Sequence, residues 1–291
     1  MNKIGGVLLA GGLGSRLFPN TKTTNKHLLP IYDKPMIFYS LSILLLAGIR
    51  NITIVCNPKD EFLYRKLLGD GNQFGVEIIY SLQESPQGIP HAVSVALETK
   101  LYEKFMLVLG DNFLYGRDFF RNLLPTLNED FKPKIFYQQV KNPELFGVIK
   151  WKDNALQDIV EKPTKYISND AVIGIYLFDE KFRHYFNNLK KSNRNEYEIT
   201  DLIKQYKIND IEAEYIGRGT AWFDMGSNDD FFNCSHFVKT IQDRQGLLVC
   251  SPHEIAYRHG WIDESSIEES IRNYTNSEYS ISLLKSLNIK I

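Results

Sequence analysis

The N-terminal sequence reads Ile4-Gly5-Gly6-Val7-Leu8-Leu9-Ala10-Gly11-Gly12-Leu13-Gly14-Ser15-Arg16. The apolar run at residues 4–10 predicts a buried strand, and the glycines after it predict a tight loop at its carboxyl end. Open α/β sheets bind their ligands at this end of the strands. Because glycine lacks a Cβ, the backbone N–H groups of such a loop can approach phosphate oxygens closely. We therefore expect an α/β fold with a phosphate site beside the first strand.

The first half of the chain alternates short apolar runs with helical stretches. The expected strands are residues 4–10, 51–56, 76–80, 105–109 and 135–140, and the expected helices are residues 35–47, 60–68, 91–100 and 118–127. This alternation is typical of βαβ units. It predicts a largely parallel sheet sandwiched by helices.

The pattern loosens after Lys141. Extended pieces at residues 147–151, 156–160 and 172–178 can lengthen the sheet or form an insertion beside it. Helical pieces at 180–189 and 200–206 follow, then a strand at 212–216 and a mostly helical tail that begins with a helix at 228–243. We divide the chain into a core, residues 1–227, and a helical C-terminal addition, residues 228–291, that packs on it.

Composition limits the classes of function. The 291 residues are 43% hydrophobic and 24% charged, as in ordinary globular proteins. With 34 basic and 35 acidic residues the formal net charge is -1, so total charge does not indicate a nucleic-acid or membrane binder. The N-terminal apolar run is too short for a signal peptide or a membrane span, and we expect a cytoplasmic protein.

The cysteines predict neither a disulfide framework nor a zinc site. Cys56, Cys234 and Cys250 are far apart, odd in number, and without CxxC or Cys/His ligand spacing. We expect free, buried thiols.

The glycine loop departs from two common nucleotide motifs. A dinucleotide-binding turn needs a third Gly or Ala, which is missing here, and Pro19 and Pro30 interrupt the helix that should follow. A Walker A loop fails because no Gly-Lys-Ser/Thr ends the run. A glycine turn without a ligand remains the alternative. Arg16 and Lys26 favour a phosphate site, since two cations close to the loop can clamp a polyphosphate.

From this segment onward the chain resembles the sugar-nucleotide pyrophosphorylases, and within them the glucose-1-phosphate thymidylyltransferases. The similar motifs follow one another over nearly the whole chain: Asn25-Lys26-His27-Leu28-Leu29-Pro30, Asp33-Lys34-Pro35-Met36-Ile37, Leu67-Leu68-Gly69-Asp70-Gly71, Gly110-Asp111-Asn112, Glu161-Lys162-Pro163, Glu198-Ile199-Thr200-Asp201, Gly217-Arg218-Gly219, Arg244-Gln245-Gly246-Leu247 and Glu254-Ile255-Ala256-Tyr257-Arg258. The resemblance implies a Rossmann-like, mostly parallel sheet with a helical C-terminal addition. It also implies synthesis of dTDP-glucose and pyrophosphate from dTTP and glucose 1-phosphate.

The resemblance assigns expected roles to individual residues. The catalytic cations would be Arg16, Lys26 and Lys162. The nucleotide would contact Leu9, Gly11, Gly12, Gly14, Ser15, Gln83, Pro86, Gly88 and Asp111. The sugar phosphate would contact Asn112, Gly147, Glu161, Lys162, Val172 and Trp222, with Gly174 beside them.

Two of these roles suit the side chains themselves. An amide donates and accepts hydrogen bonds at once, so Gln83 matches the imide and carbonyl edge of thymine or uracil, although a solvated loop glutamine is the alternative. A lysine is a compact charge for a phosphate and a glutamate accepts hydrogen bonds from sugar hydroxyls, which suits Lys162 and Glu161. Without the resemblance, these two would be read as a solvated surface pair.

A magnesium ion is the expected cofactor. Asp111 follows the strand at 105–109 through Gly110, so we expect it at the same sheet edge as the glycine loop; a turn or cap residue is the alternative. Mg²⁺ prefers carboxylate and phosphate oxygens, with only one or two protein carboxylates. The resemblance supplies Asp224 as the second carboxylate.

The implied reaction is an in-line attack of the sugar phosphate on the nucleotide α-phosphorus. Cations would offset the repulsion between two polyanions, so catalysis is mainly positioning and electrostatics. No general base is needed, because a phosphate monoester is already ionised near neutral pH. The absence of a recognisable catalytic triad in the sequence agrees with this.

The sequence departs from the family pattern at four positions. His27 and His91 replace a usual Gln, Phe146 a usual Tyr, and Met225 a usual Thr. The alternative functions are a UTP- or CTP-specific sugar-1-phosphate nucleotidyltransferase and a non-catalytic sugar-nucleotide-binding regulator. A nicotinamide dehydrogenase is a more distant alternative.

A second nucleotide site and an assembly are also implied by the resemblance. Tyr115 and Gly116 would face Glu254, Ile255 and Arg258 across an allosteric site, although a helix-packing tail is the alternative. The family forms homotetramers, so we expect a homo-oligomer. We expect no nucleic-acid or membrane partner.

Overall fold

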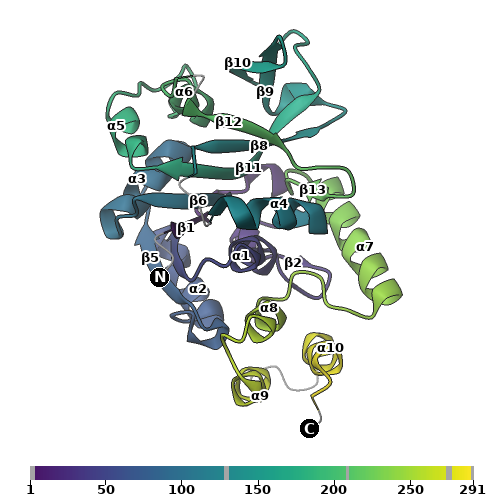
Figure 1. The fold of residues 1–291 in the computed structure, drawn as a ribbon. Coiled ribbons are helices and arrows are strands. Elements are labelled where there is room, and N and C mark those ends of the chain that lie inside the picture. Colours follow the sequence, from purple (N-terminus) through teal and green to yellow (C-terminus); the bar gives the residue numbers. More distant parts are fainter. Residues whose placement is uncertain (1–3, 128–130, 208–209, 273–276, 290–291) are drawn as a thin grey trace.

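The parallel core predicted from the apolar runs is present in the computed structural model, which describes residues 4–127, 131–207, 210–272 and 277–289 (Figure 1). β1 (Ile4–Leu9) lies between β4 (Asn51–Cys56) and β6 (Lys104–Leu109), and β5 (Glu77–Leu82) pairs with β4. All of these pairs are parallel. The structure thus confirms the α/β class and a mostly parallel central sheet.

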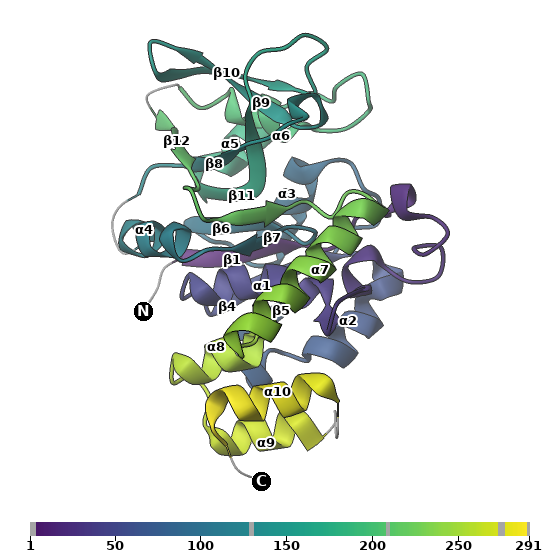
Figure 2. The same cartoon turned by 90° about the vertical axis from the view of Figure 1, so that its right-hand side faces the viewer.

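Side chains on the two faces of the central strands enter two separate apolar cores. On β1, Leu8 joins one core, whereas Val7 and Leu9 join the other. Because both faces are buried, these strands are continuous apolar runs in the sequence. Figure 2 shows the resulting layers. The first face is covered by α1 (Met36–Leu46), α2 (Glu61–Leu68) and α4 (Arg117–Leu127), and the second by α3 (Ile89–Thr99), α5 (Lys181–Asn187) and α6 (Ile199–Ile203).

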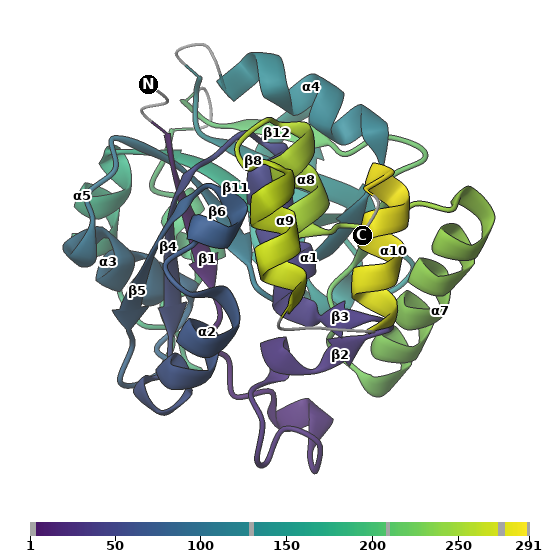
Figure 3. The same cartoon turned by 90° about the horizontal axis from the view of Figure 1, so that it is seen from below.

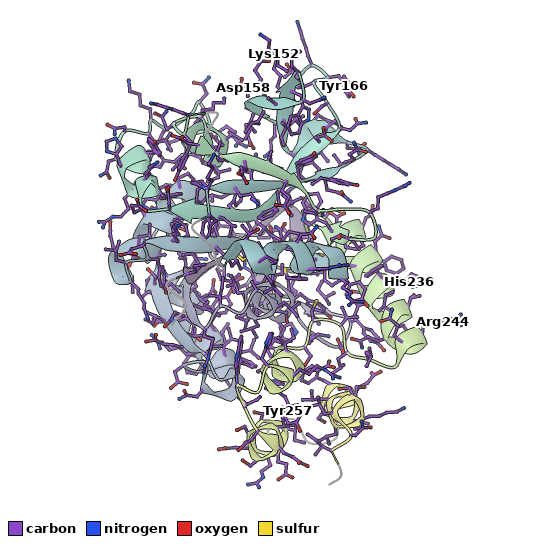
Figure 4. All side chains as sticks on the ribbon, in the orientation of Figure 1. Lys152, Asp158, Tyr166, His236, Arg244 and Tyr257 are labelled. Carbon is purple, nitrogen blue, oxygen red and sulfur yellow. The ribbon has the colours of Figure 1, made fainter. Side chains whose placement is uncertain are left out.

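The second half of the chain adds antiparallel strands. β11 (Asp170–Asp179) runs antiparallel to β6 and to β8 (Lys134–Gln139), while β12 (Glu212–Tyr215) pairs in parallel with β8. β9 (Gly147–Lys152) and β10 (Ala155–Glu161) form a hairpin that meets β11. In Figure 4 this hairpin carries the side chains of Lys152 and Asp158 at the periphery of the molecule. These pieces therefore both lengthen the sheet and project from it.

The helical tail predicted after residue 227 is confirmed. α7 (Asn228–Gln245) begins at a capping box formed by Ser227 and Asp230 and ends at Gly246. α8 (Pro252–Arg258) packs against α1, and α9 (Glu264–Arg272) and α10 (Glu278–Leu287) contact α8 and are nearest the viewer when the molecule is seen from below (Figure 3). None of the helices in the described ranges is long and apolar enough to cross a membrane.

Two small ribbons were not predicted from the sequence. β2 (Pro30–Ile31) pairs with β3 (Lys34–Pro35), and β7 (Phe113–Tyr115) pairs antiparallel with β13 (Ala221–Phe223). In the second ribbon Phe113 lies opposite Phe223. Asp111 precedes β7 and Asp224 follows β13, so the ribbon brings the two predicted metal ligands to one end.

Candidate active site

A cleft of about 280 Å³ is lined by side chains from both halves of the chain. Its walls include ten of the predicted site residues together with Gly174: Arg16, Gly88, Asp111, Asn112, Gly147, Glu161, Lys162, Val172, Trp222, Asp224 and Gly174. Among the described residues, Arg16 is the one member of the glycine loop in these walls. Gly12 and Ser15 are exposed beside the cleft, and Leu9 is buried at the end of β1.

Beneath the glycine loop lies a buried polar network. Asn25 caps the short helix η2 (Lys26–Leu28), and its Oδ1 accepts hydrogen bonds from the backbone N and the Nδ1 of His27 at 3.0 and 2.8 Å. The hydroxyl of Tyr64 donates to the same Oδ1 and contacts the carbonyl of Ala10 at 3.0 Å. Asn25 in turn donates to Asp60 at 2.7 Å. This network fixes the end of β1 and the start of η2, whose Lys26 reaches Asp111.

Two carboxylates with opposite pKa shifts flank the cleft. Lys26 Nζ lies 2.8 Å from Asp111 Oδ2. Burial acts to raise the pKa of Asp111, but the Lys26 ammonium and hydrogen bonds outweigh it and hold this pKa below its ordinary value. Burial, followed by the charges of Asp230 and Asp111, raises the pKa of Asp224. The charge of Asp111 thus reaches Asp224, which is consistent with two carboxylates that lie on the same cleft.

Arg16 approaches Asp224 at Gly226. A Cβ placed on Gly226 would lie 3.1 Å from Asp224 Oδ2 and 3.2 Å from Arg16 Nη1. Of the predicted cations, Arg16 thus lies near Asp224, and Lys26 is bonded to Asp111. No group of three or more His, Cys, Asp or Glu side chains able to hold a metal occurs among the described residues. Two carboxylates fit Mg²⁺, which commonly takes one or two together with substrate phosphates and water.

Asn112 connects three other residues of the cleft wall by hydrogen bonds. Its Oδ1 accepts from Trp222 Nε1 at 2.6 Å and from the backbone N of Gly174 at 3.0 Å, and its Nδ2 donates to Asp111 at 3.1 Å. A Cβ on Gly174 would lie 2.4 Å from Asn112 Nδ2, so only glycine fits there. Phe146 packs on Trp222 with ring centroids 5.3 Å apart. These contacts fix the Asn112 side chain and place two aromatic rings in the cleft wall.

Glu161 and Lys162 enter from the end of β10, as predicted. Lys162 has a φ of 43°, an uncommon conformation for a residue other than glycine, and its backbone N donates to Phe146 at 2.9 Å. Arg194 was missed by the sequence analysis. It contacts Glu198 through two nitrogens at 3.0 and 2.5 Å and reaches Glu161 at 3.4 Å. Lys162 and Arg194, both beside Glu161, therefore form a second pair of cations in the cleft, which we call its second cationic pole.

Gln83 and Gly88 stand at the two ends of one loop; Gly88 lines the cleft, whereas Gln83 is not one of its lining residues. Gln83 is buried at the end of β5, with its amide nitrogen 2.7 Å from His91 Nδ1. Gly88 has a φ of 100°, and a Cβ there would lie 2.1 Å from the carbonyl oxygen of Tyr197. The glycine is thus required by the close approach of residue 197, in addition to any ligand contact. Pro86 is exposed in the same loop.

Three of the four departures from the family pattern, at positions 225, 146 and 27, differ in their surroundings. Met225 is 1% exposed and packs in an apolar cluster with Tyr39 and Phe113, so its side chain is part of the core. Phe146 lines the cleft. His27 is buried, and burial lowers its pKa to about 4, so it is neutral at physiological pH.

A second cavity, of about 800 Å³, gathers all five residues predicted for an allosteric site: Tyr115, Gly116, Glu254, Ile255 and Arg258. Arg258 contacts Glu254 at 2.7 Å. Arg117 and Arg121 from α4 complete a basic rim over apolar side chains such as Leu114 and Phe120. Such a cavity can accept an anionic ligand that also has an apolar body.

The buried thiols were predicted correctly. Cys56, Cys234 and Cys250 are free and buried. Burial raises the pKa of Cys56 and of Cys250 to about 12, so neither is a reactive thiolate at neutral pH.

Comparison with known proteins agrees with this geometry. The model of the nucleotidyl transferase family matches residues 5–241. The chain belongs to the nucleotidyl transferase family. It is 40% identical over 284 residues to the glucose-1-phosphate thymidylyltransferase of Neisseria meningitidis, covering 97% of this chain and 99% of the relative. It is 43% identical over 276 residues to that of Xanthomonas campestris, covering 94% of each.

Solved nucleotidyltransferases have the same fold. A Bacillus anthracis structure assigned as a glucose-1-phosphate thymidylyltransferase, in complex with sucrose, matches with a TM-score of 0.73 and 33% identity, covering 80% of this chain and 94% of that one. A UDP-glucose pyrophosphorylase in complex with UDP-glucose matches with a TM-score of 0.71 and 25% identity, covering 81% and 98%. The fold and the enzyme class predicted from the sequence are thus confirmed.

Proposed function

We propose that this nucleotidyltransferase forms dTDP-glucose and pyrophosphate from dTTP and glucose 1-phosphate. One observation carries the proposal: a single cleft has Arg16 and the carboxylates Asp111 and Asp224 at one pole, where the buried Lys26 pairs with Asp111, and Lys162 and Arg194 at a second pole. Two cationic poles suit a reaction that joins two phosphate compounds. The names of the similar enzymes indicate which two.

In this mechanism the residues act by position and charge. Lys162 and Arg194 hold the attacking phosphate, and Glu161 accepts hydrogen bonds from sugar hydroxyls. Arg16 and Lys26 stabilise the negative charge that develops on the departing pyrophosphate. Mg²⁺ held by Asp111 and Asp224 would neutralise phosphate charge. The low pKa of Asp111 keeps its carboxylate ionised for this task.

The base would lie at Gln83, near the glycine loop. A Cβ on Gly11 would lie 3.3 Å from Gln83 Oε1, so this oxygen faces the loop that is expected to hold the phosphates. Thymine and uracil present the same imide edge, and UTP is therefore the second candidate nucleotide. The structural similarity to a UDP-glucose pyrophosphorylase supports UTP as this second candidate.

The second cavity would bind a regulatory nucleotide sugar, and the protein would assemble as a homotetramer. The cavity's three arginines over an apolar wall suit a diphosphate joined to a base or a sugar. Regulation of this kind would act on the reaction product or on a later dTDP-sugar.

The proposal is tested by measuring pyrophosphate release with and without Mg²⁺. The assay covers a panel of nucleoside triphosphates and sugar 1-phosphates. We expect dTTP with glucose 1-phosphate to be among the best pairs, with dUTP or UTP slower. A strong preference for CTP or ATP would overturn the base assignment. Binding of dTDP-glucose without any turnover would favour a regulatory protein instead.

A further inference from the structure

The side chain that meets Gln83 is a histidine at the start of a helix. Gln83 Nε2 lies 2.7 Å from His91 Nδ1, and among the described residues no hydrogen bond reaches Gln83 Oε1, which faces Gly11. The backbone N of Gln83 is held by the carbonyl of Cys56 at 2.9 Å. Because both the backbone and the nitrogen end of the amide are fixed, the direction of the oxygen is fixed as well.

His91 must be neutral for this arrangement. The amide nitrogen is a donor, so Nδ1 must carry a lone pair and the ring proton lies on Nε2. His91 is in the first turn of α3, where the helix dipole disfavours a positive charge. Burial first, then the charge of Lys191, lowers the pKa of His91, and Glu98 on α3 acts in the opposite direction. The ring of Tyr197 stacks beside it, 6.4 Å away between centroids.

We infer that His91 is a positioning residue that sets the direction of the Gln83 amide and thereby selects a thymine or uracil edge over a cytosine edge. The inference rests on the proposed function. With Nε2 toward His91, the amide offers its oxygen to the N3–H donor of thymine or uracil, and its second N–H to a carbonyl of the base.

If the Oε1 and Nε2 atoms of Gln83 exchanged places, the amide would match a different base. If Nδ1 of His91 carries a proton, Gln83 must present Oε1 to it, and Nε2 then faces the base. A donor in that place opposes the N3–H of thymine but matches the N3 acceptor of cytosine. The departure at position 91, where the family commonly has Gln, therefore makes base selection sensitive to one ring proton.

The test compares His91→Phe with His91→Gln. The phenyl ring keeps the aromatic volume beside Tyr197 but offers no lone pair, so Gln83 can turn. We expect His91→Phe to lower the ratio of kcat/KM for dTTP to that for dCTP by about 5-fold to 150-fold at pH 8, which is the range over which a matched amide pair discriminates between bases. His91→Gln supplies an amide oxygen that can accept from Gln83 Nε2, so this variant should keep the wild-type ratio.

The pH dependence gives a second readout. In the wild type the dTTP to dCTP ratio should fall as the pH is lowered below the ordinary histidine range, while in His91→Gln it should stay flat. The ratio cancels the ionisation of the triphosphate, which both nucleotides share. Lys191→Ala should move the fall to higher pH, because it removes a neighbouring cation, and Glu98→Gln should move it to lower pH.

The outcomes separate this inference from the proposed function. If His91→Phe lowers kcat/KM for dTTP and dCTP equally, or leaves both unchanged, His91 has only a packing role and the inference is wrong. If the wild type does not use dTTP at all, the proposed function fails first.

Discussion

Lys26 Nζ lies 2.8 Å from Asp111 Oδ2, although the two residues are 85 positions apart in the chain. The lysine side chain is 7% exposed and the aspartate side chain 29% exposed. A charged pair that is largely buried is costly to break, because the remaining partner loses its compensating charge. The pair connects the short helix after the glycine loop to the strand that ends in the cleft.

Removal of the Lys26 charge should therefore act on Asp111. In Lys26→Met the carboxyl group stays buried but loses its cation, so its pKa rises. We expect kcat/KM to fall by about 10² to 10³ and its acid limb to move to higher pH. Profiles from pH 5.5 to 8.5 would show the shift. Lys22→Met, at an exposed position of the same loop, is the control, and an unmoved acid limb would show that Lys26 does not govern Asp111.

Asp224→Asn should reduce turnover without a loss of stability. The raised pKa of Asp224 means that ionised Asp224 destabilises the fold above its ordinary pKa, so the amide should leave the melting temperature unchanged or higher. Turnover should be nearly abolished, and added Mg²⁺ should not restore it. Asp229→Asn, an exposed position on α7, should behave like the wild type. Near-normal Mg²⁺-dependent turnover of Asp224→Asn would remove this residue from the metal site.

The sequence predicted those parts of the site that lie at the ends of long apolar strands. Residues 105–109 are a recognisable strand, so Asp111 could be placed at its end. Arg194 could not be found in this way, because it lies in a polar segment that has the composition of a solvated loop, and only the fold brings it to Glu161. The ribbon of β7 and β13 was missed for a similar reason: its strands are three residues each, too short for a periodic pattern.

The same ribbon connects the two cavities. Leu114 and Tyr115 of β7 line the second cavity, whereas Asp111 and Asn112 just before β7 line the first. We expect Arg258→Ala to relieve inhibition by a distal dTDP-sugar with little change in the uninhibited rate. Arg244→Ala, on the outer face of α7 in Figure 4, is the matched control. Unchanged inhibition in Arg258→Ala would place the effector elsewhere.

Acid sensitivity of the fold should depend on His253. Burial lowers the pKa of this histidine from 6.5 to about 3, among the rings of Phe38, Phe74 and Tyr279. The unfolded chain binds a proton near pH 6.5 and the folded chain only near pH 3. Stability linked to His253 is thus complete above pH 6.5 and is lost as the pH falls toward 3, by about 1.4 kcal/mol per pH unit.

His253→Phe should remove this contribution. We expect urea unfolding at pH 7, 6 and 5 to give a shallower fall in the free energy of unfolding for the variant, by about 1.4 kcal/mol per pH unit below 6. The buried His27, with a pKa of about 4, keeps part of the acid sensitivity. His236→Phe, on the exposed side of α7 (Figure 4), serves as the control. Equal slopes in the His253→Phe variant and the wild type would contradict the linkage.

Removal of one positive charge at each pole of the cleft should impair the use of a different substrate. Lys162 stands with Glu161 and Arg194 at one pole, and Arg16 stands beside Asp224 at the other. Lys162→Ala should weaken the use of glucose 1-phosphate strongly and leave dTTP binding nearly intact. A lost charge-assisted contact costs about 1.5 to 3 kcal/mol, which corresponds to a rise of about tenfold or more in the Michaelis constant.

Arg16→Ala should show the reverse pattern. Its guanidinium is placed to meet the triphosphate, so the variant should bind dTTP weakly and, in the reverse reaction, use pyrophosphate poorly. Calorimetry with dTTP and steady-state kinetics in both directions would measure both effects. Lys165→Ala, an exposed lysine soon after Lys162, is the control for a general loss of positive charge. If Lys162→Ala loses affinity for dTTP but keeps its Michaelis constant for glucose 1-phosphate, the two phosphate subsites are assigned the wrong way round.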